Sequence, residues 1–184
     1  TNVKEWLKEV ESKMKNTLAL LLEQAITEDK AESSDNDAFV NWASKFPAQV
    51  MILATQINWS MGVDEALNCD NTEAALNDLL SSLEGKLAIM AETVLLELPA
   101  DSRKKFEQMI TELVHQRDVV RGLIKDKVSR LTDFRWLYHL RYTYNPEAPE
   151  LTEKLMISLS NANFYYGFEY LGIGERLVQT PLTD

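Results

Sequence analysis

This 184-residue chain has very little cysteine and no long apolar run. Its single cysteine, Cys69, cannot form a disulfide within the chain, which suits a reducing compartment. Cys69 lies between Asn68 and Asp70, an acidic setting that does not favour a cysteine nucleophile. No apolar run reaches the length of about 20 residues that a membrane-spanning helix needs, so membrane insertion is not expected.

The motifs of phosphate binding and catalysis are also missing. No Gly-x-x-x-x-Gly-Lys-Ser/Thr occurs, so no loop in this sequence can hold a triphosphate by itself. No acidic cluster has metal-ligand spacing, and no Gly-x-Ser-x-Gly elbow is present. The two histidines, His115 and His139, lie on different predicted elements, and His115 is interpreted as a helix-surface or partly buried side chain. A small enzyme with its own active site is therefore the least favoured hypothesis.

Negative charge is concentrated in the first half of the chain. The net charge is −10, with 7 basic and 16 acidic residues in 1–92 and 12 basic and 13 acidic residues in 93–184. An acidic surface is repelled by nucleic acid and by anionic membranes, so neither is an expected partner. The ordinary explanation of this charge is a set of solvated helix faces.

Apolar residues recur at helical spacing in five stretches that precede residue 130. The fourth and fifth stretches are long and joined by few residues, so we expect them to form an antiparallel hairpin. Asn71 is expected to cap the fourth helix and Asp101 the fifth. The five stretches are 3–27, 39–46, 47–67, 72–95 and 101–128.

Beyond residue 132 the spacing changes from helical to alternating, and Trp136 lies where the two patterns meet. A short polar turn at 160–163 separates the last two alternating stretches, which should pair antiparallel. The sequence thus predicts a mainly α fold: an antiparallel helix bundle or rod followed by a small antiparallel β element near the C-terminus. The alternating stretches are 138–144, 155–159 and 164–170, the last with four aromatic residues on one expected face.

Several blocks of the sequence stand out in collinear order: 47–50, 53–54, 112–121, 133–137, 140–142, 164–172 and 177–184. Together these blocks resemble the dynein heavy chain, in the C-terminal half of the linker running into the first AAA+ module. The resemblance covers most of the chain, and Gln179 is more similar to cytoplasmic than to axonemal members.

The resemblance implies a domain layout and a ligand contact. It places the helical linker region at 1–132, its β-containing end at 133–174 and the start of the first AAA+ module at 175–184. It implies that the phosphate-binding loop begins a few tens of residues after Asp184, so that this chain reads as a piece of a longer protein. The residues implied to form the adenine-side loop of the first module are Leu177, Val178, Thr180 and Pro181.

The resemblance also implies a mechanical function. In dyneins the linker is a lever that carries ATP-dependent changes of the AAA+ ring to the tail of a minus-end-directed microtubule motor. The implied cofactor is ATP or ADP in the complete motor. The implied partners are the AAA+ ring of the same heavy chain, microtubules, accessory chains and a second heavy chain, in a cytoplasmic, cytoskeleton-associated setting.

A helical scaffold that binds a partner protein, with no motor role, is the alternative hypothesis. The next forty or so residues of the parent sequence distinguish the two, because a Gly-x-x-x-x-Gly-Lys-Ser/Thr there is required by the motor hypothesis. A helical scaffold has no need of such a loop.

We predict that this 184-residue chain alone neither hydrolyses ATP nor binds it tightly. The reason is the missing phosphate loop, since an adenine-side loop supplies apolar contact alone. Isothermal titration calorimetry with ATP and Mg²⁺ checks this, and an affinity in the micromolar range would contradict it.

Overall fold

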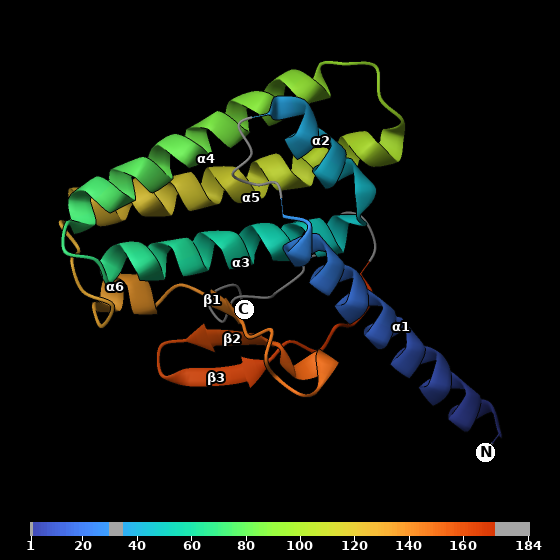
Figure 1. The fold of residues 1–184 in the computed structure, drawn as a ribbon. Coiled ribbons are helices and arrows are strands. Elements are labelled where there is room, and N and C mark those ends of the chain that lie inside the picture. Colours follow the sequence, from blue (N-terminus) through green and yellow to red (C-terminus); the bar gives the residue numbers. More distant parts are fainter. Residues whose placement is uncertain (1, 30–34, 172–184) are drawn as a thin grey trace.

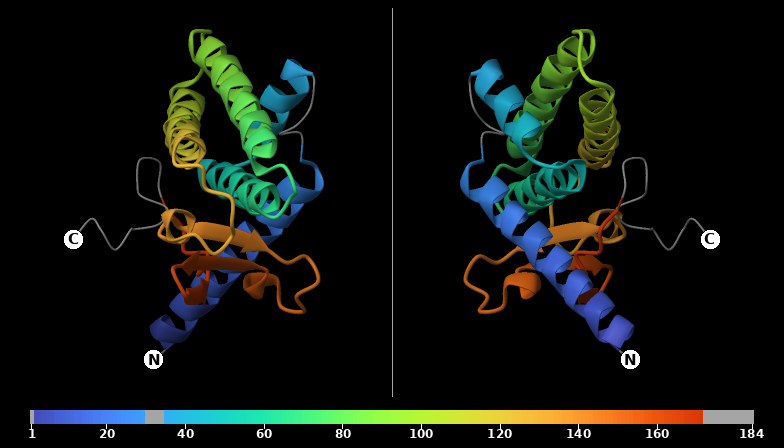
Figure 2. Two further views of the ribbon diagram at one scale, coloured as in Figure 1. Left: turned by 90° about the vertical axis from the view of Figure 1, so that its left-hand side faces the viewer. Right: turned by 90° about the vertical axis from the view of Figure 1, so that its right-hand side faces the viewer.

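Helices form most of this fold, and a small sheet packs against them. The computed structural model describes residues 2–29 and 35–171, and no helix within these ranges is long and apolar enough to cross a membrane. The elements in chain order are α1 (Asn2–Thr27), α2 (Asn36–Lys45), α3 (Ala48–Leu67), α4 (Thr72–Val94), α5 (Ala100–Lys125), α6 (Phe134–Leu137), β1 (Arg141–Tyr144), η1 (Leu151–Glu153), β2 (Leu155–Leu159) and β3 (Ala162–Tyr165). Figures 1 and 2 show α3 between the α4–α5 pair and the sheet.

The helix boundaries lie within three residues of those predicted: α2 begins at Asn36 rather than at 39, and α5 ends at Lys125 rather than at 128. Asn71 caps α4 as predicted, because its side chain accepts a hydrogen bond from the Ala74 N–H at 3.2 Å. The predicted cap at Asp101 is wrong. Helix α5 already begins at Ala100, after Pro99, whose fixed backbone torsion suits entry into a helix. Asp101 lies in the first turn, where a negative charge interacts favourably with the helix dipole.

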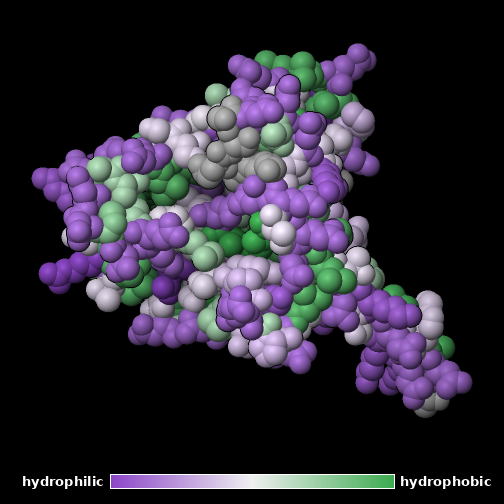
Figure 3. All heavy atoms as spheres, viewed as in Figure 1, coloured by the Kyte–Doolittle hydropathy of each residue, from purple (hydrophilic) through white to green (hydrophobic). Residues whose placement is uncertain are grey.

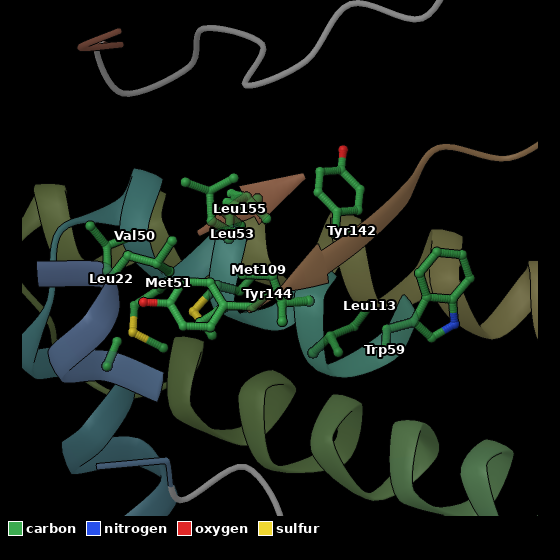
Figure 4. Packing of buried hydrophobic residues seen from close by; sticks show 14 of the residues in the cluster. Leu22, Val50, Met51, Leu53, Trp59, Met109, Leu113, Tyr142, Tyr144 and Leu155 are labelled. Atoms are coloured by element: carbon green, nitrogen blue, oxygen red, sulfur yellow. The ribbon is translucent and has the colours of Figure 1, made fainter. Parts of the chain in front are cut away.

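Helix α3 is apolar around most of its circumference and is buried accordingly. Thirteen of its 20 residues are buried, and within this helix Glu65 alone is exposed. Helices α1, α4 and α5 and strand β1 all pack on it. Figure 4 shows Leu22 of α1, Met109 of α5 and Leu155 of β2 gathered around this helix. The core therefore forms where both ends of the chain meet its middle.

The predicted hairpin of α4 and α5 is confirmed (Figure 1). Arg103 of α5 donates to the carbonyl oxygens of Val94 and Leu96, the latter at 3.0 Å. These carbonyls lie at the C-terminal end of α4, where the helix provides no partner for them. The guanidinium therefore closes α4 and fixes its connection to α5. An exposed ion pair between Arg121 and Glu84, at 3.1 Å, contributes little to stability.

The predicted antiparallel sheet is also confirmed. Strand β1 pairs with β2, and β2 with β3, in the order β1-β2-β3. Tyr142 lies opposite Ile157, which lies opposite Phe164 on its other side. Tyr142 and Ile157 are buried, whereas Phe164 at the sheet edge is about half exposed. The tight turn between β2 and β3 contains Ser160, which has a left-handed backbone with φ of 53°.

Two predicted strand boundaries are wrong. Strand β1 begins three residues after Tyr138, because Tyr138 closes the one-turn helix α6. The strand predicted at 164–170 covers 162–165 instead, and the chain then leaves the sheet. Phe168 has φ of 51°, outside the extended region, and its ring is buried. Tyr166 and Phe168 are therefore anchors of an irregular segment rather than one face of a strand.

A buried lysine joins α5 to α2. Lys105 is 8% exposed, and its Nζ donates to the carbonyl oxygens of Ser44 at 3.1 Å and Phe46 at 3.0 Å. These carbonyls lie at the C-terminal end of α2, where the helix dipole favours a cation. Burial lowers the pKa of Lys105.

Lys105→Met keeps the apolar stem but leaves both carbonyl groups without this donor. We expect the free energy of unfolding to fall by about 1–3 kcal/mol, measured by urea denaturation followed by circular dichroism. Lys104→Met, at the exposed neighbouring position, is the matched control and should change stability by less than about 0.5 kcal/mol. Equal stability of the two variants would contradict the capping role of Lys105.

Candidate functional site at the helix–sheet junction

The adenine-side loop stays a prediction. Its implied residues lie outside the described part of the chain: Leu177, Val178, Thr180 and Pro181. Within residues 2–29 and 35–171, no group of three or more His, Cys, Asp or Glu side chains could hold a metal ion. The feature that stands out in these ranges is the attachment of the sheet to the helices.

Trp136 is central to this attachment. It is fully buried on α6, and its indole meets Trp59 of α3 edge to face, with ring centroids 5.2 Å apart and planes at 82°. Trp136 Nε1 donates to Asp64 Oδ1 at 2.8 Å. A buried indole N–H left without an acceptor would be costly, so this bond fixes the orientation of the ring. We call Trp59, Asp64 and Trp136 the tryptophan junction.

Helix α6, which carries Trp136, is held in place by hydrogen bonds between the charged side chains at its N-terminal end. The Asp133 carboxylate accepts from the Arg135 N–H at 2.9 Å, and the Arg135 guanidinium donates to both carboxylate oxygens at 3.0 and 2.9 Å. These hydrogen bonds lower the pKa of Asp133. Arg135 also donates to the Asp126 carbonyl oxygen, just after α5, at 3.2 Å. A helix of one turn, too short to be stable alone, is thereby fixed between α5 and the sheet.

Strand β1 is bonded directly to α3. The Tyr142 N–H donates to Ser60 Oγ at 2.8 Å, and Ser60 is fully buried. A second link runs to α1, where Lys154 Nζ lies 2.7 Å from Glu23 Oε2. Because Glu23 is partly exposed, this ion pair alone contributes little to stability. The hydrogen bond to Ser60 is buried, so water cannot take its place. The sheet is thus fixed through its backbone as well as through packed rings.

Beyond β3, the chain is held to α3 by Gln49. Gln49 Nε2 donates to Tyr166 Oη at 2.8 Å and to the Glu169 carbonyl oxygen at 2.6 Å. Gln49 Oε1 accepts from the Leu171 N–H at 3.0 Å. We call these four residues the Gln49 clamp. The sequence predicts a helix at Gln49 and assigns this residue no role, although an amide within a mainly apolar helix is a signal for a buried polar contact.

The structure brings the two histidines together, with ring centroids 6.3 Å apart. His115 is exposed on α5, so of the two interpretations, helix-surface or partly buried, the first is confirmed. Burial lowers the pKa of His139, and the nearby His115 adds to this effect. Burial raises the pKa of Glu112, although the hydrogen bond that its Oε1 accepts from Gln116 Nε2 at 3.1 Å works against that rise. Burial is the main cause of both shifts, and structural networks perturb pKa values in the same way, so these groups do not by themselves indicate catalysis.

Three tyrosines on the sheet side of the core have raised pKa values. Burial raises the pKa of Tyr142 and Tyr166, and in Tyr166 the hydrogen bond from Gln49 partly opposes this rise. Burial, with a smaller contribution from the charge of Glu23, raises the pKa of Tyr144 to about 12. The Tyr144 hydroxyl is buried and has no hydrogen-bond partner among the described residues.

These observations define a mainly helical module closed by a small sheet, and sequence comparison adds the family. Over 99% of its length the chain is 47% identical to "Dynein heavy chain, cytoplasmic" of Dictyostelium discoideum and 41% identical to that of Drosophila melanogaster. Over its whole length it is 36% identical to "Dynein axonemal heavy chain 1" of Homo sapiens. The chain spans about 4% of the length of each of these relatives, and no family model matches it. The chain therefore belongs to the dynein heavy chain family, and it matches one short segment of those proteins.

The buried tyrosines predict a loss of stability in alkali. Each of the three pKa values is higher in the folded chain than in the unfolded chain, where a tyrosine ionises near about pH 10. The unfolded chain therefore loses these protons first, so the free energy of unfolding should fall as pH rises above about 10. Urea midpoints between about pH 9 and about pH 11, with tyrosinate absorbance at 295 nm, measure this.

The variant Tyr144→Phe tests whether ionisation of a buried tyrosine causes the loss of stability in alkali. It removes one titrating group together with a buried hydroxyl that has no described partner, so stability at neutral pH should be unchanged or higher. Its loss of stability above about pH 10 should be smaller than that of the parent chain. The same pH dependence in both proteins would show that Tyr144 does not contribute.

Proposed function

We propose that this chain is the ring-proximal part of a dynein linker, a lever that carries ATP-dependent changes of an AAA+ ring to the tail of a microtubule motor. Membership of the dynein heavy chain family supports this proposal. The observation that carries it is the tryptophan junction, in which the fully buried Trp136 is bonded to Asp64 of α3. A lever needs its anchoring element fixed to its shaft, and this junction provides that attachment.

The helical part has the form that a shaft requires. Helices α3, α4 and α5 contain 20, 23 and 26 residues, so each extends for about 30–40 Å at 1.5 Å per residue. They pack on one another, and α4 and α5 run side by side as an antiparallel pair (Figures 1 and 2). Close-packed helices resist bending because their interfaces have few alternative arrangements. Force applied at the sheet would therefore reach the far side of the helices with little local deformation.

In this proposal the energy source lies elsewhere in the motor. ATP is bound and hydrolysed in the ring, and the adenine-side loop contributes apolar contacts to the base in the first module. The lever moves because different nucleotide states of the ring contact it differently. The partners are the ring of the same heavy chain, microtubules, accessory chains and a second heavy chain. The setting is cytoplasmic and cytoskeletal, in keeping with the names of the cytoplasmic relatives.

One surface favours the alternative, a scaffold that binds a partner helix. The N-terminal half of α1 extends away from the rest of the fold (Figures 1 and 2) and carries exposed apolar residues at helical spacing. Trp6 is 61% exposed, and Val3, Leu7 and Met14 lie along the same stretch. On the face drawn in Figure 3 most residues are hydrophilic, and apolar residues reach the surface only in patches. A partner helix could cover the α1 stripe without any motor function.

Replacing Trp136 separates the two functions. A buried Trp→Ala change typically costs about 3–5 kcal/mol, and here it also leaves Asp64 without its indole donor. In a complete motor that contains this sequence, we expect Trp136→Ala to slow microtubule gliding substantially while basal ATP hydrolysis persists. Both activities are measured on soluble, folded protein.

Trp42→Ala is the matched control for a general loss of stability. Trp42 is likewise buried, and its Nε1 donates to the Ala25 carbonyl oxygen at 3.0 Å, but it lies on α2 and not at the sheet. If the proposal is right, Trp136→Ala reduces gliding relative to hydrolysis more than Trp42→Ala does. Loss of both activities in equal proportion, or no effect on either, would count against the lever function.

A further inference from the structure

We propose that Gln49 is a positioning residue, through which the segment 166–171 transmits movement to the helices. This inference rests on the proposed lever function and names a point at which force enters the lever. It concerns the irregular segment after β3, which is attached differently from the sheet itself. The tryptophan junction fixes the sheet to α3, whereas the Gln49 clamp fixes the path of the chain after it has left the sheet.

Both the nitrogen and the oxygen of the Gln49 side-chain amide form hydrogen bonds with this segment. Its two Nε2 hydrogens serve Tyr166 Oη and the Glu169 carbonyl oxygen, and its Oε1 accepts from the Leu171 N–H. A backbone carbonyl can only accept and a backbone N–H can only donate, so the orientation of the amide is fixed by its partners. Gln49 is 5% exposed, so water has little access to compete for these bonds.

The segment that the clamp holds is not one that the chain would adopt readily. Phe168 has φ of 51°, a left-handed conformation that a bulky residue rarely takes. Its ring packs edge to face on Tyr166, with centroids 4.9 Å apart and planes at 77°. Such a backbone persists only where its surroundings hold it. Without the clamp, segment 166–171 should therefore relax toward other conformations.

Two of the clamp bonds go to backbone atoms rather than to side chains. The bonds to Glu169 and Leu171 join residues more than a hundred positions apart in sequence. Backbone contacts fix the path of the chain itself, whatever its side chains do. Movement of the chain at 166–171 is therefore passed directly to the first turn of α3, the helix on which α1, α4, α5 and β1 pack.

The test uses a complete motor that contains this sequence. Gln49→Met keeps the shape of the side chain and removes its hydrogen bonds, whereas Tyr166→Phe removes one of the three. We expect Gln49→Met to slow gliding by at least about twofold, the lower end of what mutations in a coupling network produce. Basal ATP hydrolysis by Gln49→Met should stay within about twofold of the parent rate. Tyr166→Phe should also slow gliding, but by less than Gln49→Met does.

Hydrogen exchange provides a readout that a general loss of structure would not reproduce. In Gln49→Met, amides of segment 166–171 should exchange faster by about tenfold or more, while those of α4 and α5 keep their parent rates. Gln56→Met is the matched control, because Gln56 is also a buried glutamine on α3 but bonds toward Glu112. This control should leave both gliding and exchange at 166–171 unchanged.

The outcomes separate the inference from the proposed function. Faster exchange at 166–171 with parent gliding speed would overturn the role of Gln49, even if Trp136→Ala still slows gliding. If gliding survives Trp136→Ala as well, the lever function itself fails. If Gln49→Met yields no folded motor, Tyr166→Phe decides. Slower gliding of Tyr166→Phe together with faster hydrogen exchange at 166–171 then supports the inference. Parent gliding speed together with faster exchange at 166–171 overturns it.

Discussion

Helix α3 has almost no side that faces solvent, and the placement of most other elements follows from this constraint. A helix that is buried on almost every side needs cover on every side, and here α1, α4, α5 and β1 provide it. The few polar residues of α3 then need partners inside the core. Gln49, Ser60 and Asp64 fall within a sector of roughly 60° at 3.6 residues per turn. Each of them bonds to a group from the last third of the chain.

This polar sector makes the docking of the sheet specific. Apolar packing alone tolerates small shifts, because many arrangements bury similar areas. Hydrogen bonds from α3 to an indole, to a strand N–H and to the backbone at Leu171 are satisfied together in one position only. The module can therefore resist sliding between its two parts. For the proposed lever this matters more than total stability, because a joint that slips would absorb the movement it should transmit.

The sequence predicted the elements well and their contacts poorly. Helical periodicity located the long helices and the hairpin, and alternation located β2, because each signal depends on neighbours along the chain. The strand expected at 164–170 was wrong because pairing ends at Tyr165 and the Gln49 clamp then holds Tyr166 outside the sheet, while Phe164 and Tyr170 stay exposed. Trp136 was located correctly between helix and sheet, but its partner Asp64 lies 72 residues earlier. Such a pairing leaves no periodic trace in a single sequence, so Gln49 and Asp64 were missed.

The enclosure of α3 from both ends of the chain also bears on synthesis. Helices α1 to α5 leave the ribosome before residues 141–171, so for a time the sheet side of α3 has no cover. At about 5–20 residues per second this interval lasts on the order of seconds, much longer than a helix needs to form. During that time an apolar face with three unpaired polar residues is open to chaperones and to other nascent chains. The cover that residues 141–171 supply to α3 is thus also what removes this exposed face during synthesis.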